Sequence, residues 1–473
     1  MKKLKFVIAL LVGTLGLTSC SPPLWFMETE DISDYSGRQQ LIFDHLWQRG
    51  ADYYNEVNDL INSFNESDIA KELNVYVKGN GINFWDYWDK VNLSISGGTS
   101  PDIYIHCISS VPTRLKNLLN LDSMYEYDVE NGIDSLNSRD MFFDSQISDI
   151  SKYSNNEMYA WPFSSTVRVV YYNKDLFAQA GIEKLPTTWD EMEEVSKKLT
   201  TYKTPGDEDS GYQVVGYDPF SGEGQYLHQW GWLEGHSFWS YDSETGEPIP
   251  NFNDDECIDN LGKLYNSYDR RDEAARERLK DFMNEFSMTG ENVFGSGRLG
   301  MFIGNEGLNA TLQDADVDFN YGVFQLPTLS SDVTTTNWSS SYSIELYDNS
   351  KRGLTDEVAL QRNRGSWEFL KSLYSEKAQG IFSGAGFMLS DKTYYDEYIY
   401  TSEIKTALSK AIENTREAEY IAAAPNWPSD IQTYVNSIYS YDMTIQEAMD
   451  KAQTLMESKV EQYYSVNNIL GRR

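Results

Sequence analysis

The clearest secondary-structure pattern in the chain is Tyr159-Ala-Trp-Pro-Phe-Ser-Ser-Thr-Val-Arg-Val-Val-Tyr-Tyr-Asn-Lys-Asp-Leu-Phe177. Within it, the β-branched and aromatic residues from Val167 to Tyr172 predict a strand. The residues from Asn173 to Gly181 continue into a short helix that a glycine closes. Thr188 and Glu191 then form a capping box, which predicts the start of a further helix. This succession indicates a mixed α/β protein.

Strand-like and helix-like runs alternate on the N-terminal side of this stretch. Strands are expected at 41–43, 73–77 and 102–107, and helices at 53–64 and 84–95. That order argues for βαβ units and a largely parallel sheet. On the C-terminal side, we expect strands at 299–303 and 321–327, helices at 367–374 and 444–460, and polar, glycine-containing loops at 201–224 and 240–256.

The N-terminus has the features of a bacterial export signal. Three lysines precede a short apolar run from Phe6 to Leu17, which is too short for a comfortable membrane span. The run closes with Leu17-Thr-Ser-Cys20, which resembles a bacterial lipobox. The resemblance implies a signal peptide of residues 1–19, lipid on the Cys20 thiol and a tether of residues 20–34. An uncleaved signal anchor is the alternative, and in both cases the chain works outside the cytoplasm.

The composition and charge of the chain indicate which kinds of molecule it can bind and how many domains it can form. Loss of the signal lysines moves the formal net charge from −34 to about −37, which disfavours nucleic acid and anionic lipid headgroups. A hydrophobic content of 40% is enough for a real core, and roughly 450 mature residues suit two or three domains. The aromatic content of 14% suits sugar stacking as well as core packing. Cys107 and Cys257 are expected to be free thiols, with no disulfide framework and no zinc site.

The opening stretch, together with Ala180-Gly-Ile182 and Pro186-Thr-Thr-Trp-Asp-Glu191, resembles a known signature. It is similar to the YNKDLF…AG(I/L)…P.TWDE block of extracellular solute-binding proteins of sugar ABC transporters, the maltose-binding-protein-like family. Further segments resemble other blocks of that family in the same order, namely 64–65 with 73–77, 88–103, 294–303, 321–327 and 444–452. Each block is weak alone, but their joint order is specific.

The resemblance implies a two-lobed, periplasmic-binding-protein-like α/β fold, in which each lobe is a mixed, mainly parallel sheet flanked by helices. Lobe 1 is expected to hold residues 35–164 with 328–388, and lobe 2 residues 165–327 with 389–473. Three hinge crossovers are expected near 164–168, 325–329 and 387–392. A ligand would sit between the lobes, where closure exchanges water for hydrogen bonds to hydroxyls and for ring stacking.

Candidate ligand-binding residues follow from strand ends and helix starts on the expected ligand side, combined with the family's order. Aromatic platforms beside amides, imidazoles and carboxylates are what a sugar needs. The candidates are His45, Trp47, Trp85, His106, Trp161, Ser164, Tyr226, Trp230, Asn305, Glu306, Trp338 and Trp427. The chain departs from the family at Asn305-Glu-Gly307, where an aromatic residue often follows the methionine-containing strand.

Two other motif-like patterns do not meet the requirements of the sites that they resemble, and two hydrolase motifs are absent. Gly295-Ser-Gly-Arg-Leu-Gly300 fits GxGxxG, but a strand follows it where a dinucleotide site needs a helix. Asp314, Asp316 and Asp318 imitate the start of an EF-hand, but Phe319 and Gln325 stand where glycine and glutamate belong. No GxSxG elbow or HExxH motif is present, and paired carboxylates carry no information among 73 acidic residues.

The expected function is therefore capture of a carbohydrate, most simply an oligosaccharide, and its delivery to an ABC permease. We expect a monomer with no catalysis, cofactor or metal, attached to the membrane by the Cys20 lipid. Two alternatives stay open: a sugar-sensing co-receptor for a membrane kinase, and a secreted polysaccharide-degrading enzyme.

Overall fold

The computed structural model describes residues 35–133, 139–226, 235–286, 290–328, 337–394 and 402–469. Cys20 and the expected signal peptide and tether lie outside these residues, as does Trp230. Residues 39–473 form one compact unit, which contains every helix and strand considered below. Within the described ranges, none of the helices combines the length and the apolar character that crossing a membrane requires.

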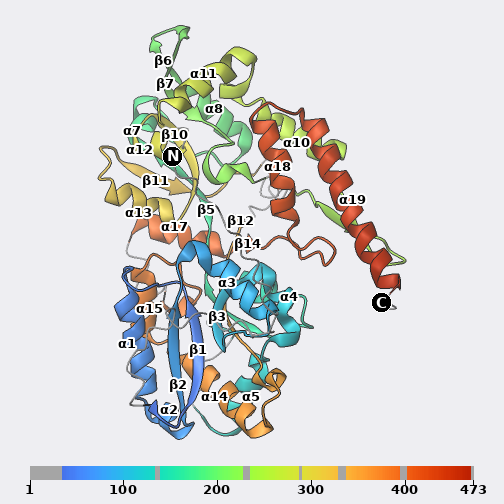
Figure 1. The fold of residues 1–473 in the computed structure, drawn as a ribbon. Helices are drawn as coiled ribbons and strands as arrows, with labels where there is room; N and C mark the ends of the chain where they lie inside the picture. Colours follow the sequence, from blue (N-terminus) through green and yellow to red (C-terminus); the bar gives the residue numbers. More distant parts are fainter. Residues whose placement is uncertain are drawn as a thin grey trace, which may run out of the picture. The chain divides into compact units, whose positions relative to one another are not determined.

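A first five-stranded sheet has the order β2-β1-β3-β13-β4, and Figure 1 labels its strands β1, β2 and β3. Its strands are β1 (Gln39–His45), β2 (Val75–Gly81), β3 (Ile103–Cys107), β4 (Ala160–Ser164) and β13 (Tyr342–Leu346). β1 runs parallel to β2 and β3, whereas β13 runs antiparallel to both β3 and β4. A strand that lies almost 180 residues beyond β4 along the chain therefore fills the gap between β3 and β4.

Helices cover this sheet with apolar faces. In α1 (Tyr54–Asn65) the buried residues include Val57, Leu60, Ile61 and Phe64, which confirms the expected helix and its spacing. α14 (Asp356–Ser372) packs against β1, β2 and β13, and Figure 1 shows it beside strands from the opposite end of the sequence. The other helices of this part are α2 (Asp68–Glu72), α3 (Phe84–Ser96), α4 (Val111–Arg114), α5 (Leu121–Glu130), α6 (Asp144–Ser151), α15 (Glu376–Gly384) and α16 (Lys392–Tyr394).

A second five-stranded sheet has the order β11-β5-β10-β7-β6. Its strands are β5 (Arg168–Asn173), β6 (Thr201–Thr204), β7 (Asp207–Tyr217), β10 (Leu299–Asn305) and β11 (Tyr321–Phe324). Only the pairing of β7 with β10 is parallel in this sheet. Its helices include α7 (Lys174–Gln179), α8 (Trp189–Leu199), α11 (Glu273–Asn284), α12 (Gly290–Gly295), α13 (Gly307–Asp314) and α17 (Glu403–Ile412).

Three expectations need correction. The sheets are mixed, but they are not mainly parallel, because β13, β5 and β11 each pair antiparallel with their neighbours. The expected loop at 201–224 is largely the hairpin β6–β7, whose turn contains Gly206 at φ +79°. The outer half of β7 is exposed, so its polar residues do not show the alternation that marks a half-buried strand. Part of 240–256 likewise pairs, as β8 (Trp239–Tyr241) with β9 (Pro248–Pro250).

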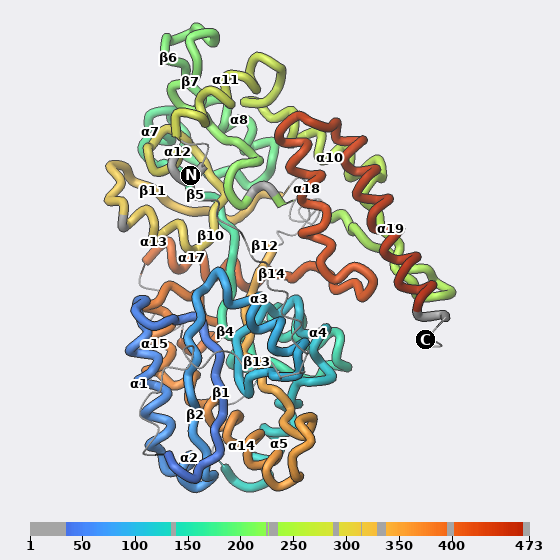
Figure 2. Tube along the Cα trace, in the orientation of Figure 1, coloured from blue at the N-terminus to red at the C-terminus, as the bar shows by residue number. Residues whose placement is uncertain are grey.

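The chain passes between the two sheets where the resemblance placed the first crossover. β4 ends at Ser164 in the first sheet and β5 begins at Arg168 in the second, a passage that can be followed in Figure 2. A short additional pair, β12 (Asn337–Trp338) with β14 (Thr415–Arg416), joins two later segments of the chain. Leu389 bridges to Ser164, which keeps the end of the first sheet beside this passage.

The C-terminal helices form a separate apolar cluster. α18 (Trp427–Tyr439) and α19 (Ile445–Ile469) pack together, and α10 (Asp255–Tyr265) packs against α19. Trp427, Phe238 and Met449 are fully buried at the centre of this cluster. The last helix was expected from the capping box of Thr444 and Glu447, and the two residues do bond to each other at the start of α19.

Candidate functional site

Polar and aromatic side chains from four segments meet around Arg168, the first residue of β5. Its side chain is almost completely buried, and Nε donates a hydrogen bond to Glu223 Oε2 at 3.1 Å. The guanidinium carbon lies 3.8 Å from the centroid of the Trp338 ring, and Nη1 donates to the Trp338 carbonyl at 3.0 Å. Arg168 therefore holds Trp338 by a cation–π contact and by a hydrogen bond to its backbone.

Two more predicted residues join this group. The ring of Tyr226 meets the Trp338 ring edge to face at 4.4 Å between centroids. Asn305 Nδ2 donates to Glu223 Oε1 at 3.3 Å, so one carboxylate connects Asn305 with Arg168. The group formed by Arg168, Glu223, Tyr226, Asn305 and Trp338 is called the Trp338 cluster below.

Glu306 lies beside the Trp338 cluster and ties it to the passage between the sheets. Its Oε2 accepts a hydrogen bond from the backbone N–H of Val167 at 3.2 Å. Burial raises the pKa of the Glu306 carboxyl to about 7, although the positive charge of Arg168 opposes that shift. The Glu306 carboxyl therefore changes its charge near neutral pH, and it does so while hydrogen-bonded to Val167 in the crossover.

A second aromatic group lies where α3 meets the end of β3 and the start of β13 in the first sheet. The Trp88 and Tyr342 rings stack at 5.1 Å with an angle of 16° between their planes. The His106 ring meets Trp88 edge to face, and its Nε2 lies 3.0 Å from Asn92 Oδ1. Burial lowers the pKa of His106 well below its usual value, so the ring is neutral. Trp88, Asn92, His106 and Tyr342 are called the Trp88 cluster.

Trp85 extends the Trp88 cluster into solvent. It lies at the start of α3 with 83% of its surface exposed. The Phe84 ring contacts the rings of both Trp85 and Trp88. A tryptophan that is so exposed gains little from core packing, and it offers its ring for stacking.

The two clusters are connected by a short segment of chain. Trp338 and Tyr342 are four residues apart, and the hydroxyls of Ser339 and Ser341 both bond to that of Ser165 in the first crossover. Glu417 Oε1 accepts the Ser341 N–H at 2.8 Å. Burial is the main cause of the raised pKa of Tyr342, and the negative charge of Glu306 adds to it. Glu306 therefore lies close to the Trp88 cluster as well as to the Trp338 cluster. The chain can therefore present aromatic rings, amides and carboxylates from both sheets near one crossover.

Five predicted ligand residues are core residues instead, and we remove them from the candidate site. Trp161 is 1% exposed and packs against Trp367 at 4.9 Å, and Trp427 is fully buried with its Nε1 bonded to the Glu419 carbonyl. Trp47 stacks on Phe382. The remaining two, His45 and Ser164, are 0% and 2% exposed.

His45 shows why strand-end position misleads. Its ring lies between those of Phe43 and Trp47, and neither ring nitrogen has a hydrogen-bond partner among the described residues. Burial lowers the pKa of His45 to about 3, so the side chain is a neutral core ring. Trp230 falls outside the described residues. The predicted residues that the structure does bring to the two clusters are Trp85, His106, Tyr226, Asn305, Glu306 and Trp338.

Sequence reasoning missed Arg168, Glu223, Trp88 and Tyr342. Arg168 carried a usable signal, because a cation inside an apolar strand must find partners when the strand is buried. No comparable signal in the sequence marked Glu223 or Tyr342, because their roles depend on contacts with segments that are distant along the chain.

Comparison with known proteins places this arrangement in a family. Residues 71–380 match the profile of the bacterial extracellular solute-binding proteins. The chain belongs to that family. This solute-binding protein is 24% identical over 396 residues to the diacetylchitobiose-binding protein DasA of Streptomyces coelicolor, covering 80% of this chain and 81% of DasA. It is 23% identical over 315 residues to a binding protein of Brucella abortus, covering 64% and 69%.

Solved structures share the two-lobed fold of this solute-binding protein. An ABC substrate-binding protein from Listeria monocytogenes in complex with cycloalternan superposes with a TM-score of 0.63 at 17% identity, covering 92% of this chain and 100% of that one. The sugar-binding protein MalE from Xanthomonas citri superposes with a TM-score of 0.63 at 13% identity, covering 91% and 99%. At these identities the likeness establishes the fold, in which the two sheets belong to separate lobes.

Proposed function

We propose that this solute-binding protein captures a neutral oligosaccharide between its lobes and delivers it unchanged to an ABC permease. The observation that carries the proposal is the pairing of two aromatic groups with amides and carboxylates on either side of one crossover. Rings stack on the apolar faces of sugars, and the polar groups bond to hydroxyls. The diacetylchitobiose ligand in the name of DasA and the cycloalternan in the Listeria complex support this substrate class.

The proposed ligand-binding residues are Trp85, His106, Tyr226, Asn305, Glu306 and Trp338, with Trp88 and Tyr342 added from the structure. The proposed lobes keep their expected bounds, residues 35–164 with 328–388 and residues 165–327 with 389–473. Closure of the lobes would bring both clusters onto one ligand. Lobe 1 supplies the Trp88 cluster and Trp338, and lobe 2 supplies the other members of the Trp338 cluster.

We further propose that the protein performs no chemistry on the sugar, acts as a monomer and is anchored outside the cytoplasm, at the cell surface or in the periplasm, by lipid on Cys20. Membership of a family of binding proteins supports the absence of catalysis. The lipobox-like Leu17-Thr-Ser-Cys20 supports the anchor, and two or more acyl chains are what stable anchoring needs.

Calorimetric titration of the full-length chain with a panel of oligosaccharides tests the proposal. We expect saturable binding to at least one oligosaccharide, and mass spectrometry of the recovered ligand should show no shortened products. Trp85→Ala should weaken that binding by about tenfold, the loss of one stacking partner. Leu93→Ala is the matched control, because Leu93 is 71% exposed on the same helix and should leave affinity unchanged. Released sugar would favour the enzyme, and equal effects of both variants would contradict the assignment of Trp85.

A further inference from the structure

One short segment carries an aromatic ring of each cluster. Trp338 lies in β12, and Tyr342 begins β13 four residues later. The positions of both rings therefore depend on how the backbone between them is held. Arg168 bonds to the Trp338 carbonyl at one end of this segment. A second set of contacts reaches the segment from the C-terminal part of the chain.

β14 and the residue that follows it hold this backbone in place. β12 pairs in parallel with β14, and the two strands lie side by side in Figures 1 and 2. The N–H of Ser339 bonds to the Arg416 carbonyl at 3.0 Å. Two residues later, the N–H of Ser341 bonds to a side chain, Glu417 Oε1, at 2.8 Å. The Glu417 carboxyl thus supplies the next acceptor beyond the end of the strand pair.

Glu417 is itself held by helix α6. The residue is 4% exposed, and its backbone N–H donates to Asp149 Oδ2 at 2.9 Å. Asp149 belongs to α6 and is 8% exposed, and Lys152 Nζ donates to its Oδ1 at 2.8 Å. Burying a carboxyl group costs free energy unless hydrogen bonds compensate. Asp149, Glu417 and Ser341 are therefore connected by two buried hydrogen bonds that set where the segment lies.

Two further contacts strengthen the connection with α6. Ser145, Asp149 and Tyr153 follow one another at a spacing of four residues, along α6 and the turn after it. Ser145 Oγ donates to the Ile412 carbonyl at 3.0 Å, and the Tyr153 hydroxyl accepts the Tyr420 N–H at 2.8 Å. The stretch of chain that contains β14 is therefore held to α6 at three points, and Asp149 makes the middle contact.

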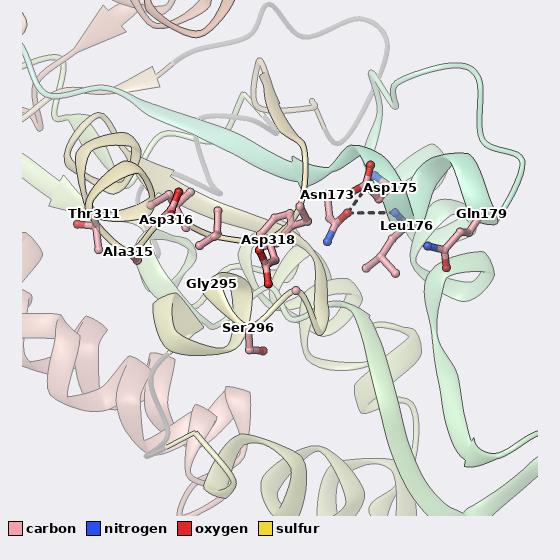
Figure 3. Close-up of a pocket in the computed structure, with 14 residues that line it drawn as sticks. Asn173, Asp175, Leu176, Gln179, Gly295, Ser296, Thr311, Ala315, Asp316 and Asp318 are labelled. Carbon is pink, nitrogen blue, oxygen red and sulfur yellow. Dashed lines mark hydrogen bonds between the residues drawn. The ribbon is translucent and has the colours of Figure 1, made fainter.

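A pocket of about 690 Å³ in the second lobe lies apart from these contacts (Figure 3). Its wall comes from α7, the turn between α12 and β10, and the end of α13 with the segment that follows. The wall includes Asn173, the last residue of β5, whereas Arg168 at the other end of that strand belongs to the Trp338 cluster. The position of Trp338 therefore depends on Arg168 and on the contacts from α6, and not on this pocket.

We propose that Glu417 and Asp149 are positioning residues for ligand binding. Both are buried and bonded to protein groups, so they act by holding the Ser341 backbone and not by contacting the sugar. The proposal rests on the proposed function, because that function gives the Trp338 and Tyr342 rings their role. Rings that are already in place lose less freedom when a ligand binds, so a looser segment should bind more weakly.

Calorimetry of the full-length chain with maltotriose, mannotriose and diacetylchitobiose is the first test. Glu417→Ala leaves the Ser341 N–H without its acceptor and should weaken binding by about tenfold. Glu417→Gln keeps an oxygen that can accept this N–H, so its affinity should stay within a factor of about two of the wild type. Asp149→Ala should also weaken binding by about tenfold, and Asp149→Asn, which keeps an acceptor for the Glu417 N–H, should restore most of the affinity.

Asp269→Ala is the matched control for the loss of a buried carboxyl. Asp269 is fully buried and accepts hydrogen bonds from Ser196 and Thr200, away from both clusters. The variant should lower the midpoint of urea unfolding, as the other alanine variants do, and leave affinity unchanged. An equal loss of affinity in Asp269→Ala would show that general destabilisation explains the effect, and it would overturn the proposal.

Fluorine NMR follows the Trp338 ring in the absence of a ligand. In protein labelled with fluorotryptophan, the resonance of Trp338 is the one that Trp338→Phe removes. This resonance should shift in Glu417→Ala and in Asp149→Ala, and it should stay in place in Asp269→Ala. If one of the first two variants does not fold, the other provides the same test. An unshifted resonance in the folded variants would overturn the proposal.

The measurement without ligand separates this proposal from the proposed function. If the wild type binds none of the three saccharides, the proposed function fails, and the Trp338 resonance alone decides whether Glu417 and Asp149 position the ring. If the wild type binds and Glu417→Ala binds equally well, the proposed function stands and the positioning role is overturned. Strictly additive effects of Glu417→Ala and Trp338→Phe on affinity would overturn it as well.

Discussion

The guanidinium of Arg168 lies against the indole of Trp338 at 3.8 Å from the ring centroid, and the same guanidinium bonds to the Trp338 carbonyl and to Glu223. Arg168 begins β5 immediately after the first crossover, whereas Trp338 belongs to the segment that leads back to the first sheet. The orientation of a proposed stacking platform therefore depends on a buried cation at the junction of the lobes.

Arg168→Lys should loosen that platform although it preserves the charge. Lysine lacks the planar fork that bonds Glu223, Ser340 and the Trp338 carbonyl together. We expect oligosaccharide affinity to fall by about tenfold, which corresponds to ~1.4 kcal/mol. A double-mutant cycle with Trp338→Phe, followed by calorimetry, measures the coupling. Strictly additive effects of the two substitutions would contradict a positioning role for Arg168.

Glu306 should make folding stability depend on pH. Burial raises its folded-state pKa from 4.5 to about 7, so between these values the folded chain binds more protons than the unfolded chain. The stabilisation is thus complete below about pH 4.5 and is lost as the pH rises through about 7. Glu306→Gln removes this titration, so the unfolding free energy of the variant, measured in urea, should rise relative to that of the wild type by about 3 kcal/mol as the pH increases across this range.

Asp269→Asn is the matched control for Glu306→Gln. Burial also raises the pKa of Asp269 to about 7, but its carboxylate bonds to Ser196 and Thr200 on α8 and the residue after it. Both variants should flatten the pH profile of stability, and only Glu306→Gln should change oligosaccharide affinity. An equal loss of affinity in Asp269→Asn would show that the effect is general and not a property of the site.

Trp161→Ala should destabilise the first lobe without acting on a ligand directly. The side chain is 1% exposed and contacts the rings of Phe142, Trp367 and Tyr374. Truncation of a buried tryptophan costs about 3–5 kcal/mol, so thermal unfolding should begin at a clearly lower temperature. Affinity of the folded fraction, measured at low temperature, should stay within a factor of about two. Normal thermal stability with lost affinity would instead restore Trp161 to the site.

Local signals in the sequence predicted the elements near the first crossover well. Thr188 caps α8 through its side-chain oxygen, as the pattern indicated, and the predicted short helix from Asn173 is α7, which Asn173 caps in the same way. The reciprocal half of the capping box differs, because the Glu191 carboxylate accepts from the N–H of Thr187 and not of Thr188. Such signals depend on a few neighbouring residues, so one sequence contains them completely.

The candidate site was only partly predictable, because a residue at a strand end can face either the ligand or the core. His106 and His45 both occupy such positions, yet His106 reaches Asn92 and Trp88 whereas His45 is enclosed by Phe43 and Trp47. The direction of strand pairing was equally hidden. β13 reaches the first sheet only after the chain has passed through the second, and no local pattern reports that it enters antiparallel.

Cys20→Ser should release the protein from the membrane fraction. If the lipobox-like Leu17-Thr-Ser-Cys20 is processed, Cys20 is the one thiol that gains lipid, and metabolic labelling with an alkyne fatty acid should mark the wild type. Cys107→Ser is the matched control: burial raises the pKa of the Cys107 thiol to about 12, so it is poorly reactive and labelling should persist without it. Fatty-acid label that persists in the Cys20→Ser variant would contradict lipidation of Cys20. A Cys20→Ser variant that stays in the membrane fraction, with a mass that matches the wild type, would also contradict it and would favour an uncleaved signal anchor.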